Sequence, residues 1–145
     1  MSNLFNPQEY QKFVARLDAL QHDTKPLWGS MTAAQMLAHC TETQEACNGK
    51  PLVGTPFFVK LFKGFIKKSV LNDTPYKQGI PTHPQYIIHN ERDFEEEKAK
   101  FLASLERFVA NTGTAEHSLF GTLSVEERNK AIVKHHSHHW AQFGV

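Results

Sequence analysis

The chain has 145 residues, of which 40% are hydrophobic and 21% charged, and this length is enough to bury one core without disulfides. We therefore expect residues 1–145 to form a single domain. The formal net charge of +1 excludes the strong basic field that sequence-independent nucleic-acid binding needs, so we expect no nucleic-acid partner. The first residues carry no signal segment and no stretch is long and apolar enough to span a bilayer, so we expect a cytoplasmic protein.

The first predicted helix runs from Pro7 to about Gln21. Asn6 is suited to cap it, Pro7 fits the first helical position, and Glu9 is favourable in the first turn. Apolar residues recur at helical spacing and predict one buried face: Tyr10, Phe13, Val14, Leu17 and Leu20.

The second predicted helix opens with a capping box of Thr32 and Gln35 and ends at Asn48-Gly49. His39 lies on its apolar stripe, so we expect this imidazole to point into the core. Cys40 and Cys47 are two turns apart, about 10 Å along the axis, which is too far for a disulfide. We expect both thiols to be reduced.

The segment from Pro56 to Val70 has apolar residues at helical spacing with lysines between them, and predicts a basic amphipathic helix interrupted by Gly64. Such a helix could dock on a membrane surface or on a partner. We favour the alternative that its phenylalanines pack on the other helices, and we expect no membrane contact. The prolines and glycine from Asn72 to Pro84 predict a strap without regular structure, and Tyr86–Ile88 a short extended piece.

Two more helices complete the predicted fold. Asn90 and Asp93 are suited to open one that ends at 111–113, and a capping box at Ser124 and Glu127 opens the last, which runs to Phe143-Gly144. Four main helices predict an all-α fold, an antiparallel four-helix bundle with an inserted basic amphipathic helix and a Pro-rich strap.

Four histidines crowd the last predicted helix, and two of them have the spacing of a metal site. His135 and His139 are four residues apart, so their rings project from one helical face. His39 can add a third imidazole from the facing helix, and three protein ligands leave a coordination position open for water or substrate. The sequence therefore predicts a reactive metal site. The alternative is that these histidines only pack or form hydrogen bonds.

Other polar residues near this trio have two interpretations each. Glu42, one turn from His39, could act as a general base, although a solvated helix glutamate is favoured. Cys40 could act as a nucleophile, although a buried core thiol is favoured. His138 and Gln142 are assigned to positions around the metal ligands. His136 is interpreted as a supporting or surface residue. Four histidines are interpreted as solvated loop residues: His22, His83, His89 and His117.

Two segments together resemble a known family: Trp28-Gly29-Ser30-Met31 through Gln35-Met36-Leu37-Ala38-His39, and His135-x-x-His138-His139-x-x-Gln142. They resemble the DinB/YfiT-like superfamily of metal-binding four-helix bundles. Phe120-Gly121-x-Leu123-Ser124-x-Glu126-Glu127 and the segment 138–145 resemble a bacterial branch of it without an assigned activity. The resemblance implies His39, His135 and His139 as ligands of zinc, nickel or a similar divalent ion.

The resemblance also implies an activity. Characterised members of that superfamily are thiol-dependent transferases and isomerases, in which a metal activates a low-molecular-weight thiol such as bacillithiol or mycothiol. A metal- and thiol-dependent transferase is therefore the leading hypothesis, and the resemblance adds a homodimer as its assembly. A metal-dependent hydrolase, and a non-catalytic binding or interaction module with a vestigial site, are the alternatives.

Overall fold

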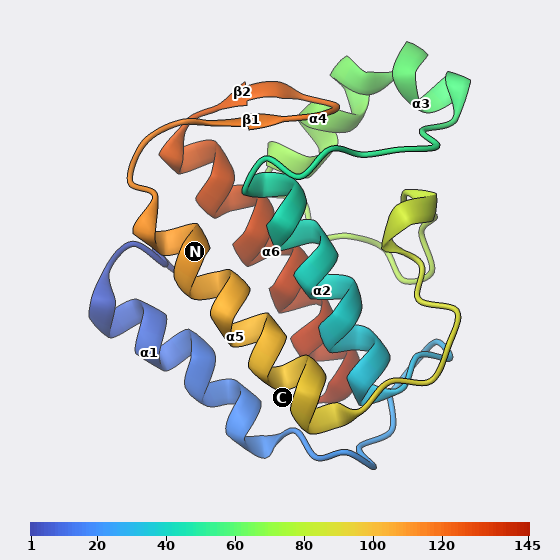
Figure 1. Ribbon diagram of the computed structural model, residues 1–145, viewed down its shortest axis with the longest axis vertical. Coiled ribbons are helices and arrows are strands. Elements are labelled where there is room, and N and C mark those ends of the chain that lie inside the picture. Colours follow the sequence, from blue (N-terminus) through green and yellow to red (C-terminus); the bar gives the residue numbers. More distant parts are fainter.

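The computed structural model describes residues 1–145 and contains six α-helices and one two-stranded sheet (Figure 1). Two short 3-10 turns, η1 and η2, join them. In chain order the elements are α1 (Pro7–Ala15), η1 (Arg16–Ala19), α2 (Ala33–Cys47), α3 (Phe57–Leu61), α4 (Lys63–Leu71), η2 (Pro84–Tyr86), α5 (Phe94–Ala110), β1 (Ala115–His117), β2 (Gly121–Leu123) and α6 (Val125–Phe143).

The prediction of an all-α four-helix bundle is wrong, because the chain between α5 and α6 forms an antiparallel β-hairpin. Ala115 pairs with Leu123 and His117 with Gly121. The His117 ring nitrogen Nδ1 accepts hydrogen bonds from the backbone of Leu119 and Phe120, and this closes the turn between the strands. Strands of three residues are too short to produce a recognisable alternation of apolar and polar residues, so the pattern did not reveal them.

The starts of α1, α2, α5 and α6 were predicted correctly, because each has a side chain that satisfies free backbone N–H groups. Asn6 accepts from two backbone nitrogens at the start of α1. Capping boxes open α2 at Thr32 and α6 at Ser124, and Asp93 caps α5. The first helix is shorter than expected, since α1 ends at Ala15 and continues only as the 3-10 turn to Ala19.

The core brings α2, α5 and α6 together, with α1 alongside (Figure 1). Trp140 on α6 is its largest fully buried side chain and lies 5.4 Å from Phe13 and 5.6 Å from Phe101, measured between ring centroids. His136 stacks on Trp140 and is itself fully buried. This packing joins α6 to α1 and α5, and α2 also contacts α6. The site described below lies between α2 and α6.

The basic segment forms two short helices instead of one. The chain breaks at Phe62, which caps the end of α3 and the start of α4, and not at Gly64 as predicted. The expectation that its phenylalanines pack on the other helices is also wrong. Only α4 has an inner face, through Val70 and Leu71, which contact the core. The outward side chains stay uncovered: Phe57, Phe58, Leu61, Phe62 and Phe65.

The strap is present as predicted, because residues 72–83 contain neither helix nor strand. Tyr86 belongs to the 3-10 turn η2, so only the residues after it are extended. None of the helices has the length and the apolar character that crossing a membrane demands.

Candidate metal centre

Three histidines from two helices meet between α2 and α6. The Nε2 atoms of His39 and His135 are 3.0 Å apart, and the His139 ring centroid lies 4.7 Å from those of both other rings. One ligand atom from each of the three lies within 4.8 Å of the others. His39 and His139 are buried and His135 is partly exposed. The residues that the spacing selected are therefore brought together, and they could hold a metal ion.

Each of these rings has its other nitrogen engaged. His39 Nδ1 lies 2.8 Å from the carbonyl oxygen of Tyr86, and His139 Nδ1 lies 2.7 Å from Oε1 of Gln142. His135 Nδ1 lies 3.3 Å from the hydroxyl of Thr43, which donates its own hydrogen to the carbonyl of Cys40. All three partners can act only as acceptors in these contacts. Each Nδ1 therefore carries the hydrogen, and each Nε2 carries a lone pair.

His136 is compatible with the same assignment for His135 when the side-chain amide of Gln44 is turned. Its Nδ1 lies 3.2 Å from His135 Nδ1, and its Nε2 lies 2.9 Å from the amide nitrogen of Gln44. The buried Gln44 oxygen has no hydrogen-bond partner. Because a half turn of the amide exchanges its two ends, this oxygen can accept from His136 Nε2–H. His136 Nδ1 is then free to accept a second bond from His135 Nδ1–H.

The consequence is that His39 and His135 face each other with two lone pairs and no hydrogen between them. Such an arrangement is repulsive unless a cation lies there. A tetrahedral metal ion with bonds of 2.0–2.1 Å separates two imidazole nitrogens by about 3.3 Å, within a few tenths of an ångström of the distance seen here. The donor set of three neutral imidazoles thus fits a divalent transition metal ion.

The surroundings disfavour a proton as that cation. Burial lowers the pKa of His39, and the nearby His138 lowers it further against the opposing effect of the Tyr86 carbonyl. Burial lowers the pKa of His135 well below its usual range, followed by the effects of His139 and His39. Burial and His39 lower the pKa of His139 to about 3. The rings are therefore neutral at pH 7, which is the form that binds metal.

A second group of potential ligands shares His135. Cys40, His135 and His136 also place one ligand atom each within 4.8 Å of one another. Burial raises the pKa of the Cys40 thiol well above its usual range, and its sulfur contacts Met36 at 3.8 Å. The Nδ1 side of His135, which faces His136, already has its hydrogen engaged. The three-imidazole set is therefore the better candidate, and both cysteines are free thiols as expected.

Two residues assigned to the surroundings of the ligands lie beside them. Gln142 accepts from His139 and donates its amide to the carbonyl of Trp28 at 2.9 Å. The His138 ring lies 5.2 Å from His139 and makes edge contacts with Trp28 and Tyr76. Thr43 was on the apolar stripe of the predicted helix, four residues after His39, and this spacing could have indicated its role.

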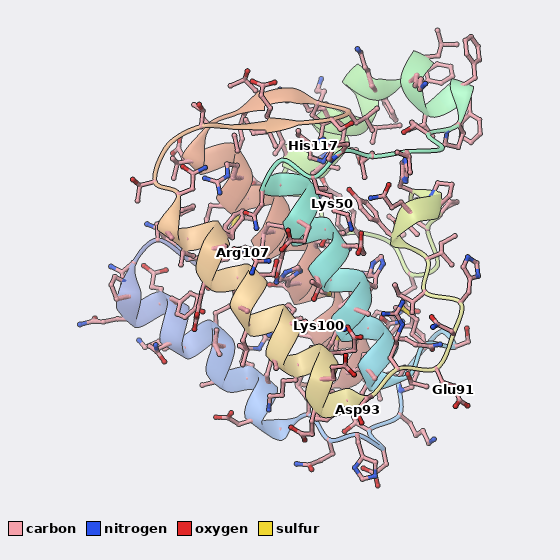
Figure 2. All side chains as sticks on the ribbon, viewed as in Figure 1. Lys50, Glu91, Asp93, Lys100, Arg107 and His117 are labelled. Atoms are coloured by element: carbon pink, nitrogen blue, oxygen red, sulfur yellow. The ribbon has the colours of Figure 1, made fainter.

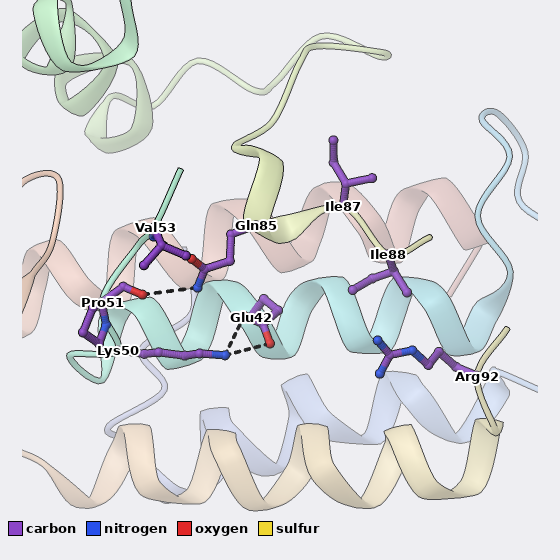
Figure 3. Close-up of a pocket in the computed structure, with 8 residues that line it drawn as sticks. All are labelled: Glu42, Lys50, Pro51, Val53, Gln85, Ile87, Ile88 and Arg92. Atoms are coloured by element: carbon purple, nitrogen blue, oxygen red, sulfur yellow. Dashed lines mark hydrogen bonds and ion pairs between the residues drawn. The ribbon is translucent and has the colours of Figure 1, made fainter. Parts of the chain in front are cut away.

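Glu42 lies one turn after His39 on a neighbouring face of α2. Its carboxylate forms an ion pair with Lys50 at 2.9 Å (Figure 3). Both residues line a hollow of about 440 Å³ on this face, together with Gln85 and Arg92, and none of the three histidines lines it. The carboxylate is thus engaged away from the imidazoles.

The interpretation of His117 as a solvated loop residue is wrong. His117 lies at the end of β1, is 5% exposed and stacks on Phe120 at 4.5 Å (Figure 2). His22 and His89 are exposed as expected. His83 is partly buried, with its ring nitrogens bonded to Thr55 and to the backbone of Gln85.

Comparison with known proteins corrects the family resemblance. A family model described as "Protein of unknown function (DUF1569)" matches residues 5–144, and this family is distinct from the DinB/YfiT-like superfamily. The resemblance rested on short segments around His39 and around His135 to Gln142, together with the segment from Phe120 to Glu127, and these segments do not establish membership of that superfamily. No curated protein and no solved structure matches the chain.

Proposed function

We propose a function for this chain from its site alone, because the chain belongs to the DUF1569 family, whose description assigns none. The protein binds one divalent transition metal ion through Nε2 of His39, His135 and His139. The observation that carries this proposal is the pair of facing lone pairs on His39 and His135, each fixed by a hydrogen bond at the opposite ring nitrogen. Outer partners of this kind orient metal-binding imidazoles and increase their basicity.

The site is suited to a reactive ion. Three protein ligands leave a coordination position for an exogenous group. When bound, such an ion would lower the pKa of a group held in that position. The protein residues orient the three rings and keep them neutral, and the rings of Trp28 and Tyr76 contact the neighbouring His138.

We propose a low-molecular-weight thiol as the group that is activated, in a transferase reaction. The groups of potential ligand atoms contain no carboxylate, and the Glu42 carboxylate is paired with Lys50. Water ordinarily needs a general base in addition to the metal, whereas a thiol has a much lower pKa and is deprotonated on coordination. A metal-dependent hydrolase is the alternative, with His138 as the base.

Elemental analysis of protein purified without an affinity tag or chelator tests the metal site. Wild type is expected to hold or take up one equivalent of zinc, nickel or cobalt. The His135→Ala variant should lose it, and the His89→Ala variant, which changes an exposed histidine, should retain it. Wild-type protein that takes up no divalent ion would refute the proposal and would favour a non-catalytic module.

Cobalt-loaded protein distinguishes thiol from water. Addition of cysteine or glutathione is expected to produce a sulfur-to-cobalt charge-transfer band, which is absent in His135→Ala. A cobalt spectrum that responds to pH but not to either thiol would refute the thiol transferase and favour the hydrolase.

A further inference from the structure

The α3–α4 unit presents a surface that the rest of the protein leaves uncovered. It carries the five outward apolar side chains named above together with Lys60, Lys63 and Lys68, and we call it the apolar–lysine face. Phe57 is 80% exposed and Phe65 75%, and Phe58, Leu61 and Phe62 are each more than half exposed. Soluble monomers rarely leave so many large apolar side chains in water at one place, and such surfaces mark contact sites.

This face is held firmly on the protein. On α4, Val70 and Leu71 contact the core, and the helix packs on α6. The ammonium group of Lys134 binds the carbonyl oxygens of Ser69 and Asn72 at 2.7 and 3.2 Å, which ties down the C-terminal end of α4. The inner side of the unit is therefore packed, and α3 projects away from the other helices (Figure 1). The outward side chains therefore make no contribution to the core.

The positive charge of the apolar–lysine face favours an anionic partner. Residues 51–71 contain four lysines and no acidic residue. Lys67 pairs with Glu127 at 3.8 Å, whereas Lys60, Lys63 and Lys68 form no ion pair. A second copy placed symmetrically on this face would bring the free lysines of both copies against one another. An anionic surface with an apolar layer directly beneath it would satisfy both kinds of side chain.

We infer that the apolar–lysine face binds the surface of an anionic lipid bilayer. The phenylalanines and Leu61 enter the boundary between headgroups and acyl chains, and the lysine ammonium groups donate to lipid phosphates. Lysine stems are apolar and long enough to let their charged ends reach the headgroups while the ring side chains lie deeper. The earlier expectation of no membrane contact depended on packed phenylalanines, and their exposure removes its basis.

Vesicle flotation tests this inference. Wild-type protein should float with vesicles of equal parts phosphatidylcholine and phosphatidylglycerol, and not with phosphatidylcholine alone. The Lys60→Gln, Lys63→Gln, Lys68→Gln triple variant should partition roughly 100-fold more weakly, since each lysine near an anionic surface contributes about fivefold. A Phe57→Ser, Phe58→Ser variant should lose a similar factor, on the order of 100-fold.

A matched control removes the same charge elsewhere. Lys12, Lys25 and Lys77 are exposed and unpaired, and their replacement by Gln should leave flotation within about twofold of wild type. All variants should keep the wild-type unfolding midpoint and metal content, because the changed side chains are exposed and far from the histidines. This metal measurement also separates the result from that of the proposed function.

Three outcomes would overturn the inference. The first is wild-type protein that does not float, or that floats equally well with neutral and anionic vesicles. The second is a pair of face variants that float like wild type. The third is a dimer of wild-type protein in sedimentation equilibrium that the Phe57→Ser, Phe58→Ser variant abolishes, which would make the face an interface between two copies.

Discussion

Gln142 offers the sharpest test of how the metal centre is built. Its side chain is 5% exposed, accepts from His139 Nδ1 at 2.7 Å and donates to the Trp28 carbonyl at 2.9 Å. In Gln142→Ala the His139 ring loses the partner that fixes its orientation. Removal of such an outer partner typically weakens metal binding 10- to 100-fold, or roughly 1.4–2.7 kcal/mol. The metal-free protein should also lose about 1–3 kcal/mol of stability, since a buried N–H is left unpaired.

Two measurements separate these effects. Competition with a chromophoric chelator gives the dissociation constant for zinc, and urea unfolding in excess chelator gives the stability of the metal-free protein. Gln142→Glu keeps an acceptor for His139 but removes the donor to Trp28. This variant should therefore bind zinc at least about tenfold more tightly than Gln142→Ala, although its metal-free stability is also reduced.

The matched control lies on the same helix. Asn129 accepts from the backbone of Leu4 and donates to the carbonyl of Ser2, so Asn129→Ala removes the same two kinds of hydrogen bond far from the histidines. It should lower stability and leave the zinc dissociation constant unchanged. If Gln142→Ala also binds zinc as tightly as wild type, His139 is not a ligand through Nε2 and the reasoning fails.

Three further predictions concern the hairpin, the loop before α2 and the thiols. Burial lowers the pKa of His117 to about 4. Between about pH 6.5 and pH 4 this histidine is therefore protonated in the unfolded chain and neutral in the folded protein. The free energy of unfolding consequently decreases as the pH falls through this range. Urea unfolding should show that His117→Asn, which can still accept in the turn, loses about 1–2 kcal/mol less than wild type between about pH 7.5 and pH 5; equal losses would contradict this. Gly29→Ala should destabilise the protein by at least about 1–2 kcal/mol and weaken zinc binding, because Gly29 has φ of +81° and an added Cβ would lie 2.7 Å from Gln142 Nε2; unchanged thermal unfolding and zinc affinity would argue against it. Cys40 and Cys47 are buried with raised pKa values, so mass spectrometry should find them alkylated by iodoacetamide only in denaturant, and rapid labelling of native protein would refute this.

Features encoded in a few neighbouring residues could be predicted from the sequence. The capping boxes at Thr32 and Ser124 predicted the starts of α2 and α6, because the reciprocal bonds involve residues three apart. The inward direction of His39 and the one-turn spacing of His135 and His139 likewise depend only on residues close together in the sequence. That these three side chains meet is therefore a consequence of two helical stripes that face each other.

Features that depend on distant partners could not be predicted. The carbonyl of Tyr86 holds His39 from a segment 47 residues away, and no local pattern indicates such a contact. His117 was misinterpreted because its burial depends on the hairpin, whose strands are too short to give a period. The pattern of Phe57 to Phe65 predicted helical structure, but periodicity showed neither the break at Phe62 nor whether anything covers the apolar side chains.

The separation of the ligands along the chain links metal to folding. His39 and His135 are 96 residues apart, so an ion held by both would close a loop that includes most of the protein. The unfolded chain could offer the same ion only histidines close together in sequence, such as those in residues 135–139, without a fixed geometry, and would bind it more weakly. By mass action, each tenfold rise in free metal above the dissociation constant would add about 1.4 kcal/mol to the folded state. The stability of this protein would then be set by the metal supply around it as well as by its own core.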